Sequence, residues 1–303
     1  MALTPVPEAQ DRLLSDVVPL GVETVPISEA DGRVLAGDLR SLRTQPPFPA
    51  SAMDGYAVRA ADLAPGVRLA VIGQSAAGHG FAGRVEAGQA VRIFTGAPVP
   101  PGADTILIQE NATRNGDTVV ADGPVETGRH VRAAGLDFAE GEIGLAAGRR
   151  LGIREIGLAA AMNHGVLTVY RRPRVAILAT GDELVAPGSP VGPDQIVASN
   201  GLSLAALVRS VGGEALDLGI APDRLDVLRA RIRDGLDAGA DVICLLGGAS
   251  VGDHDLTRPA LEAEGLVLDF WKIAMRPGKP LMFGRIGERR AIGLPGNPVS
   301  SLV

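Results

Sequence analysis

The C-terminal half of this 303-residue chain alternates between two hydrophobic patterns. Short apolar runs bounded by glycine predict strands, and apolar residues spaced three or four apart predict helices between them. Strands are expected at 175–179, 215–220, 242–246, 266–273, 281–284 and 291–294, and helices at 202–211, 223–236 and 256–263. This alternation predicts α/β architecture, with a mainly parallel sheet covered by helices on both faces.

The N-terminal half has a different pattern. Helical spacing predicts helices at 7–20 and 153–162, with many glycines and short apolar runs in 53–137. The apolar runs within that segment are 67–72, 90–95, 105–109 and 118–121. They are typical of strands in a small, mostly β unit. A proline-rich segment at 45–49 and the run RRPR at 171–174 mark boundaries.

Composition and charge exclude several classes of protein. The net charge of −6 leaves no broad basic face, so we expect no nucleic-acid partner. No apolar stretch reaches the roughly 18–20 residues of a membrane span, and the N-terminus lacks a basic-then-apolar leader, so a cytoplasmic protein without membrane contact is expected. The single cysteine, Cys244, lies in an apolar run, which predicts a buried, inert thiol. The four histidines lack the paired spacing that zinc sites favour.

Polar and glycine-rich segments follow the predicted strands of the C-terminal half. In open α/β sheets, ligands bind beyond the carboxyl ends of the strands. Glycine N–H groups and Lys or Arg bind phosphate oxygens, and carboxylates suit Mg²⁺. The charged candidates are Glu183, Asp223, Asp255, Lys272, Arg276 and Lys279. Together they predict a site for a phosphorylated ligand and a divalent cation.

Each of these segments has a simpler interpretation when taken alone. The run 180–182 is also typical of a β-turn in which Asp182 caps the next element. Asp223 by itself favours the N-cap of the following helix. The glycines of 247–252 are equally compatible with a tight turn from strand to helix. The convergence of five loops at one sheet edge favours the ligand site.

Eight motifs occur in a characteristic order along the chain. They are PPF at 46–48, SAMDGYAV at 51–58, RIFTGAPVPPGAD at 92–104, TGDEL at 180–184, SN at 199–200, SVG at 250–252, RPGKP at 276–280 and LPGNP at 294–298. These motifs resemble those of the molybdopterin molybdenumtransferases, of the MoeA type, and of the related domain of gephyrin. The resemblance covers nearly the whole chain.

The resemblance implies an elongated subunit with discontinuous domains that acts as a homodimer. The implied domains are a molybdopterin-binding α/β domain (1–26 and 172–303), a linker domain (27–45 and 138–171) and an inserted β-rich domain (46–137). The family also has a C-terminal β-barrel that is absent from this sequence. Because 299–303 after Pro298 suits the opening of a helix, we expect the native protein to continue past Val303.

The resemblance also implies a reaction: with Mg²⁺, molybdate is inserted into adenylylated molybdopterin and AMP is released. The active cleft of such proteins lies between the α/β domain of one subunit and the inserted domain of its partner. Position by position, the inserted side corresponds to Asp54, Thr95 and Asp137, and the acidic, metal-binding set to Glu183, Asp223 and Asp255. The expected ligand-binding residues are Gly247, Gly248, Ser250, Gly252, Lys272, Arg276, Lys279, Pro295, Asn297 and Pro298.

Three departures from the family pattern bear on the ligand. Leu246 stands where relatives usually have Thr or Ser, and Ala249 where Val is common, so one hydroxyl contact is missing. Arg276, where Lys is also common, keeps the charge but changes the hydrogen-bond geometry. With the missing barrel, these departures leave a second hypothesis, a non-catalytic molybdopterin-binding module or truncated paralogue. The related adenylyltransferase would not explain 53–137. The intact acidic set and Thr95 favour the transferase.

Overall fold

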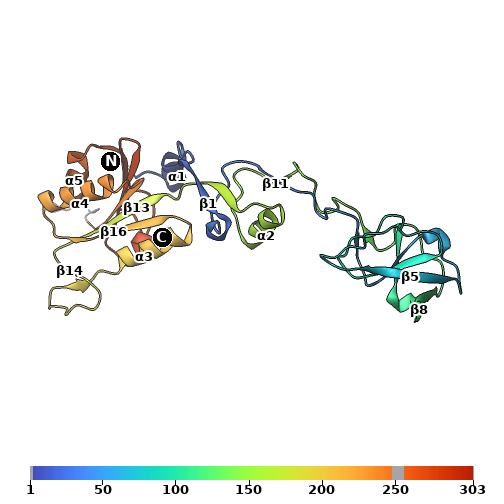
Figure 1. Ribbon diagram of the computed structural model, residues 1–303. Helices are drawn as coiled ribbons and strands as arrows, with labels where there is room; N and C mark the ends of the chain where they lie inside the picture. Colours follow the sequence, from blue (N-terminus) through green and yellow to red (C-terminus); the bar gives the residue numbers. More distant parts are fainter. Residues whose placement is uncertain (1–2, 248–255, 303) are drawn as a thin grey trace. The chain divides into compact units, whose positions relative to one another are not determined.

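The structure is a computed structural model that describes residues 3–247 and 256–302, and its chain forms two units (Figure 1). The first unit joins Met1–Glu23 to Tyr170–Val303, and the second is Thr24–Val169. The chain therefore leaves the first unit after its N-terminal helix and returns to it 146 residues later. The predicted boundaries, and the finer division into linker and inserted domain, stay predictions.

A six-stranded sheet with the order β16-β13-β17-β20-β19-β18 forms the centre of the first unit. Its strands are β13 (Arg174–Thr180), β16 (Glu214–Ala221), β17 (Val242–Leu246), β18 (Leu266–Trp271), β19 (Met282–Ile286) and β20 (Arg289–Leu294). The first four strands in the order are parallel neighbours. β19 pairs antiparallel with both β20 and β18, so β18 runs in the same direction as β20. The predicted mainly parallel sheet is confirmed.

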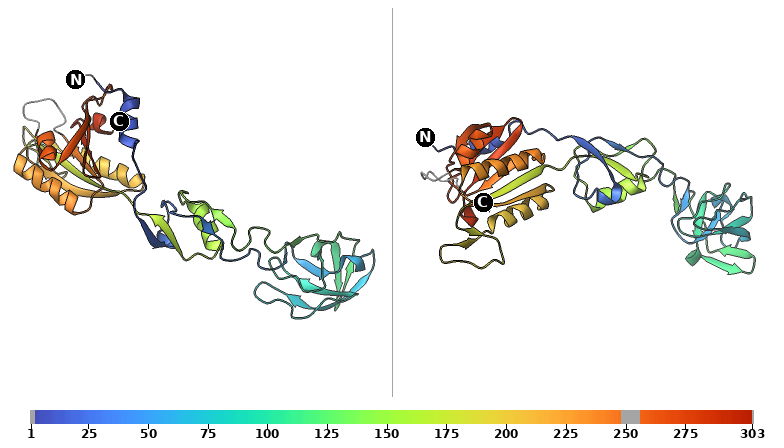
Figure 2. Two further views of the ribbon diagram at one scale, coloured as in Figure 1. Left: turned by 90° about the horizontal axis from the view of Figure 1, so that it is seen from above. Right: turned by 60° about the vertical axis from the view of Figure 1, so that its left-hand side comes forward.

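Helices cover both faces of this sheet, as predicted (Figure 2). They are α1 (Val6–Leu14), α3 (Asn200–Ser210), α4 (Leu225–Asp237), α5 (Thr257–Ala263) and α6 (Pro298–Leu302). Successive residues of β13 point to opposite faces: Leu178 packs in the core with Leu228 of α4, and Ile177 packs with Leu204 of α3. Near β18 and β19, α1 contributes Ala9 to the core. The apolar alternation along the strands therefore fixes which helices lie on which face.

Several elements begin or end a few residues from their predicted bounds, and two of these differences affect the interpretation. The first helix ends at Leu14 and not at residue 20. Pro19 lacks a backbone N–H and disfavours helical backbone at the residue before it, so the helical spacing at Val17 was misleading. The helix α4 begins at Leu225, which leaves Asp223 in the preceding loop. Cys244 is buried as predicted, and burial raises the pKa of its thiol to about 12.

The second unit holds a six-stranded sheet with the order β7-β4-β6-β5-β9-β8. Its strands are β4 (Gly55–Val58), β5 (Arg68–Ser75), β6 (Gln89–Ile93), β7 (Thr105–Ile108), β8 (Ala112–Asn115) and β9 (Thr118–Ala121). Neighbouring residues of β4 enter different cores, Tyr56 one and Ala57 the other. This arrangement confirms the predicted β-rich character of 53–137.

Smaller elements complete the description. They are the pairs β1 (Val22–Pro26) with β12 (Val166–Tyr170), β2 (Leu39–Arg40) with β11 (Ile143–Leu145), β3 (Ala50–Ser51) with β10 (Val131–Arg132), and β14 (Leu184–Val185) with β15 (Ile196–Val197), the helix α2 (Ile153–Ala161), and the 3-10 turns η1 (Ile27–Glu29), η2 (Ala60–Asp62) and η3 (Gln109–Asn111). Leu35, Leu151 and Leu167 form a separate core beside α2. Within 3–247 and 256–302, no helix has the length and apolar character to cross a membrane.

Candidate functional site

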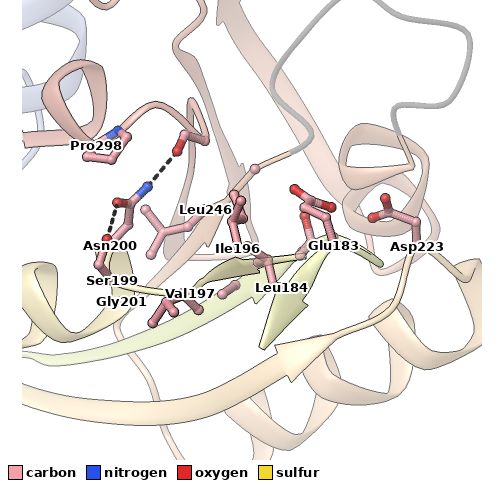
Figure 3. Close-up of a pocket in the computed structure, with 16 residues that line it drawn as sticks. Glu183, Leu184, Ile196, Val197, Ser199, Asn200, Gly201, Asp223, Leu246 and Pro298 are labelled. Carbon is pink, nitrogen blue, oxygen red and sulfur yellow. Dashed lines mark hydrogen bonds between the residues drawn. The ribbon is translucent and has the colours of Figure 1, made fainter. Parts of the chain in front are cut away.

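A cavity of about 330 Å³ lies at the carboxyl edge of the parallel strands in the first unit (Figure 3). Thr180 ends β13, Gly247 follows β17 and Gly296 follows β20, and all three line the cavity. The start of α3 and the short strand β15 close another side with residues 196–201. Because parallel strands end at the same edge, loops far apart in the sequence meet here, as the sequence predicted.

Two of the predicted carboxylates, Glu183 and Asp223, line this cavity together. The Asp223 N–H donates to Asp182 Oδ1 at 3.1 Å, which brings a third carboxylate to the same place. Burial raises the pKa of Asp223, and the negative charges of Asp182 and Glu183 raise it further. The surroundings of Asp223 therefore disfavour its negative charge.

The structure confirms one part of the simpler interpretations of this acidic region and contradicts another. A β-turn does span 181–184, where the Leu184 N–H donates to the carbonyl oxygen of Gly181 at 3.3 Å, but the predicted capping role of Asp223 is wrong. The N-cap of α4 is Arg224, with no side-chain cap hydrogen bond, so Asp223 does not cap the helix. Asp182 accepts its hydrogen bond from the loop that follows β16, not from the element after it. Both side chains are therefore available for a role at the cavity.

Glycines allow the ends of β13 and β17 to approach each other. Gly247 has φ +103°, and a Cβ there would lie 2.5 Å from the carbonyl oxygen of Thr180. A Cβ on Gly181 would lie 2.4 Å from Oε2 of Glu183, so the carboxylate folds back against the glycine. The hydroxyl of Thr180 is buried and finds no hydrogen-bond partner in the described part of the chain. A ligand group or water would satisfy it.

Asn200 connects the start of α3 to the loop after β20. Its Nδ2 donates to the carbonyl oxygen of Gly296 at 2.7 Å, and the Ser199 hydroxyl donates to its Oδ1 at 3.4 Å (Figure 3). In the same loop, Asn297 Oδ1 accepts from the N–H groups of Val299 and Ser300 at 3.0 and 3.2 Å. The Asn297 side chain therefore caps α6, which begins at Pro298 as predicted.

The predicted cations lie in and beside the loop after β18, and they do not line the cavity. Lys272 has φ +77°, and its Nζ lies 5.4 Å from the centroid of the Trp271 ring. The guanidinium carbon of Arg258 lies 5.3 Å from the same centroid. Arg276 and Lys279 are exposed. Since β18 runs parallel to β20, these cations lie at the same sheet edge as the cavity.

In the second unit, the structure joins Asp54 to Thr95. Asp54 Oδ1 accepts hydrogen bonds from the Thr95 N–H and from its hydroxyl, both at 2.8 Å. The N–H donor lowers the pKa of Asp54 most, followed by the hydroxyl, and the charge of Arg92 lowers it further. Asp137 is exposed, and its N–H donates to the carbonyl oxygen of Gln45. Within the described residues, no hydrogen bond joins Asp137 to the Asp54–Thr95 pair.

Of the remaining predicted residues, two prolines lie in the described part of the chain and four residues lie outside it. Pro298 lines the cavity, whereas Pro295 lines a separate, more apolar one beneath α1. Four predicted residues, Gly248, Ser250, Gly252 and Asp255, lie outside the described residues. The roles of all these residues stay predictions.

Among the cavity residues absent from the predicted site, three have polar side chains: Thr180, Ser199 and Asn200. Each belongs to a motif, TGDEL or SN, that carried the family resemblance, so the signal was present in the sequence. Leu246 also lines the cavity, which places this departure from the family pattern in the wall of the site.

Comparison with known proteins gives two family matches. Residues 4–163 match the MoeA N-terminal region (domain I and II), and residues 176–303 match a probable molybdopterin binding domain. The molybdopterin molybdenumtransferase of Haemophilus influenzae is 38% identical over 299 residues, which cover 98% of this chain and 73% of that protein.

Further relatives agree in sequence and in structure. Molybdopterin molybdenumtransferase 2 of Mycobacterium tuberculosis is 38% identical, over 92% of this chain and 71% of that protein. The crystal structure of the molybdopterin biosynthesis MoeA protein from Pyrococcus horikoshii OT3 superposes with a TM-score of 0.84 at 30% identity, covering 99% of this chain and 76% of that one.

Proposed function

The chain belongs to the MoeA-type molybdopterin molybdenumtransferases, enzymes of molybdenum cofactor biosynthesis, and on that premise we propose that it inserts molybdate into adenylylated molybdopterin in a Mg²⁺-dependent reaction that releases AMP. The observation that carries the proposal is the pair Glu183 and Asp223 in one cavity at the carboxyl edge of the sheet. An acidic cluster beside glycine N–H groups suits a phosphorylated substrate that arrives with a divalent cation.

The cluster fits Mg²⁺ by the chemistry of its donors. Hard oxygen ligands are the ones that Mg²⁺ prefers, and a bound cation would offset the burial and the acidic neighbours that raise the pKa of Asp223. Glu183 and Asp223 would hold the ion, and Asp255 is the third proposed ligand. When bound, Mg²⁺ would supply a Lewis acid that polarises the phosphoanhydride. Within the described residues, no group of three or more His, Cys, Asp or Glu is arranged to hold a metal ion. The proposed site therefore needs further oxygen ligands, such as substrate phosphates and water.

The other groups of the proposed site bind and orient the substrate. Lys272, Arg276 and Lys279 would neutralise the phosphates of the pterin and of the departing AMP. The buried Thr180 hydroxyl is placed to hydrogen-bond a ligand in the cavity. Asp54, which its Thr95 donors keep ionised, would accept hydrogen bonds from substrate N–H or O–H groups and would not donate a proton at neutral pH.

We further propose that the enzyme works as a homodimer. The support is the family resemblance, in which the inserted domain of one subunit completes the cleft of its partner. The Asp54–Thr95 pair of one subunit would then act on a substrate held by Glu183 and Asp223 of the other. This arrangement predicts that mixed dimers of complementary variants recover activity.

A non-catalytic molybdopterin-binding module is the second candidate, favoured by Leu246 in the cavity wall. The two functions differ in product. The test supplies the purified protein with adenylylated molybdopterin, molybdate and Mg²⁺, and measures active cofactor by its ability to activate a cofactor-free molybdoenzyme. We expect activation that requires molybdate. Binding of the pterin without any activation would support the binding module and reject the transferase.

A further inference from the structure

The side chain of Arg92, on β6, contacts two residues that adjoin Asp54, Gly55 and Gln109. Its Nη1 donates to the carbonyl oxygen of Gly55, the residue after Asp54, at 3.1 Å. Its Nη2 donates to Oε1 of Gln109 at 2.8 Å. The backbone N–H of Gln109 in turn donates to the carbonyl oxygen of Asp54 at 3.1 Å. One guanidinium therefore links β4, β6 and the residue that follows β7, next to Asp54.

The same guanidinium also contacts the neighbour of Thr95. Its central carbon lies 4.9 Å from the centroid of the Phe94 ring and 5.1 Å from that of Tyr56. Tyr56 is buried at 4% exposure, so it provides a fixed surface behind the guanidinium. Stacking on two rings while donating in two directions requires a planar group with several donors, which Arg has and Lys lacks.

The strands around Arg92 are closely packed, so a change in its position would also move its neighbours. A Cβ on Gly55 would lie 2.1 Å from the carbonyl oxygen of Leu107, so β4 and β7 approach each other as only glycine permits. The positive charge of Arg92 also acts on Asp54, whose ionised form it stabilises.

We propose that Arg92 is a positioning residue that holds Asp54 and Thr95 in their hydrogen-bonded arrangement for the reaction. It contacts the residue after Asp54 and the residue before Thr95, and it touches neither side chain of the pair. The inference rests on the proposed function, because a positioning role for catalysis requires that Asp54 act in turnover.

The experiment compares Arg92→Met and Arg92→Lys with the wild type in the full chain. Arg114→Met is the matched control: it removes the same charge from β8, an edge strand of the same sheet, where the exposed Arg114 donates to the carbonyl oxygen of Gly116. The readouts are the titration of the Asp54 carboxyl by ¹³C NMR, assigned with Asp54→Asn, and the separate values of kcat and KM for AMP release.

We expect Arg92→Met to raise the pKa of Asp54 and to lower kcat by roughly 100-fold, the size of effect expected for a displaced catalytic group, with KM changed by less than about threefold. In Arg92→Lys the positive charge is kept, so the pKa of Asp54 should rise less than in Arg92→Met. The value of kcat should recover less, because Lys cannot donate in two directions as the planar guanidinium does. Arg114→Met should match the wild type in both readouts.

A folded Arg92→Met with unchanged kcat and unchanged Asp54 titration would overturn the proposal. If that variant does not fold, Arg92→Lys decides, and wild-type kcat in the Lys variant would overturn it. Failure of the proposed function looks different: the wild type itself would then release no AMP, while Arg92→Met would still shift the Asp54 titration.

Discussion

Asp54 in the second unit and Asp223 in the first are both predicted site carboxylates, but their surroundings shift their pKa values in opposite directions. Two donors from Thr95 hold the Asp54 carboxylate, and its pKa is lowered. Asp223 is partly buried beside Asp182 and Glu183, and its pKa is raised. The protein itself satisfies the first carboxylate, whereas the second lies in a cluster that a bound cation would complete.

The difference follows from the way each region folds. A loop after an antiparallel strand offers backbone N–H groups, and Thr95 presents both its N–H and its hydroxyl to Asp54. The parallel edge of the first unit instead brings together loops that each carry carboxylates. A metal site is expected to be less stable when it is empty than when its ion is bound. Substitution of Asp54 and of Asp223 should therefore change stability in different ways.

The largest effect is expected from Asp223→Asn. Loss of one metal ligand should lower the rate of AMP release by at least about 100-fold. The melting temperature at pH 7 should stay the same or rise, because the raised pKa means that the ionised carboxyl costs folding energy. That cost is absent below the ordinary pKa of 3.8 and appears as the pH rises through the folded pKa, so the gain in the variant should grow with pH.

Asp226→Asn is the control for this variant. Asp226 lies three residues further on, is exposed, and pairs with Arg224. It should keep wild-type turnover. Near-wild-type AMP release by Asp223→Asn at saturating Mg²⁺ would remove Asp223 from the proposed metal site.

The next effect concerns the two regions acting in different subunits. Asp54→Ala and Glu183→Gln homodimers should each be inactive, because every cleft lacks one half. Isolated heterodimers of the two variants should recover about half the wild-type turnover, since one of two equivalent clefts would be intact. Tandem affinity tags would isolate the heterodimer. No recovery in verified heterodimers would place both halves in the same subunit.

A smaller effect is expected from Lys279→Ala. Loss of one charged contact to phosphate should weaken binding of adenylylated molybdopterin by roughly 10-fold or more, with a lesser effect on the rate constant. Calorimetry without molybdate measures the binding step alone. Arg289→Ala, which removes a cation from the opposite end of β20, serves as the control. Unchanged affinity in Lys279→Ala would remove this residue from the ligand site.

The smallest effect is expected from Thr95→Val, which removes one donor from Asp54. A carboxylate with a lowered pKa contributes stability above its unfolded pKa and loses it as the pH falls through the folded pKa. The variant should therefore melt slightly below the wild type at pH 7, and the difference should shrink below about pH 3.8. Asp54 is only half-buried, so the difference should be at most about 2 °C. A constant difference at every pH would show that Asp54 is not its source.

The sequence predicted the first sheet well because its strands are continuous apolar runs between helices. It missed β4, in which all four residues are buried, so alternation was absent. It also missed β8, which is mostly exposed and polar. Pattern alone detects a strand with one covered face more readily than either of these cases.

The candidate site shows a similar limit. The meeting of Glu183 and Asp223 was predictable, because the carboxyl ends of parallel strands lie at one edge. The bond from Asn200 to Gly296, 96 residues apart, depends on how α3 packs, which the pattern does not determine. Asp54 and Thr95 were identified only through the family resemblance. Their hydrogen bond depends on the register that pairs Gly55 with Ile93, and apolar spacing leaves that register open.

The Mg²⁺ dependence of AMP release, measured side by side for the wild type, Glu183→Gln and Asp54→Asn, tests the central claim most directly. We expect no AMP release from the wild type without Mg²⁺, and a rate of release that saturates as Mg²⁺ is added. Glu183→Gln should need roughly 10- to 100-fold more Mg²⁺ for half-maximal release, whereas Asp54→Asn should keep the wild-type midpoint and reach a lower plateau. Release without Mg²⁺ in the wild type, or an equal shift of the midpoint in both variants, would contradict this claim.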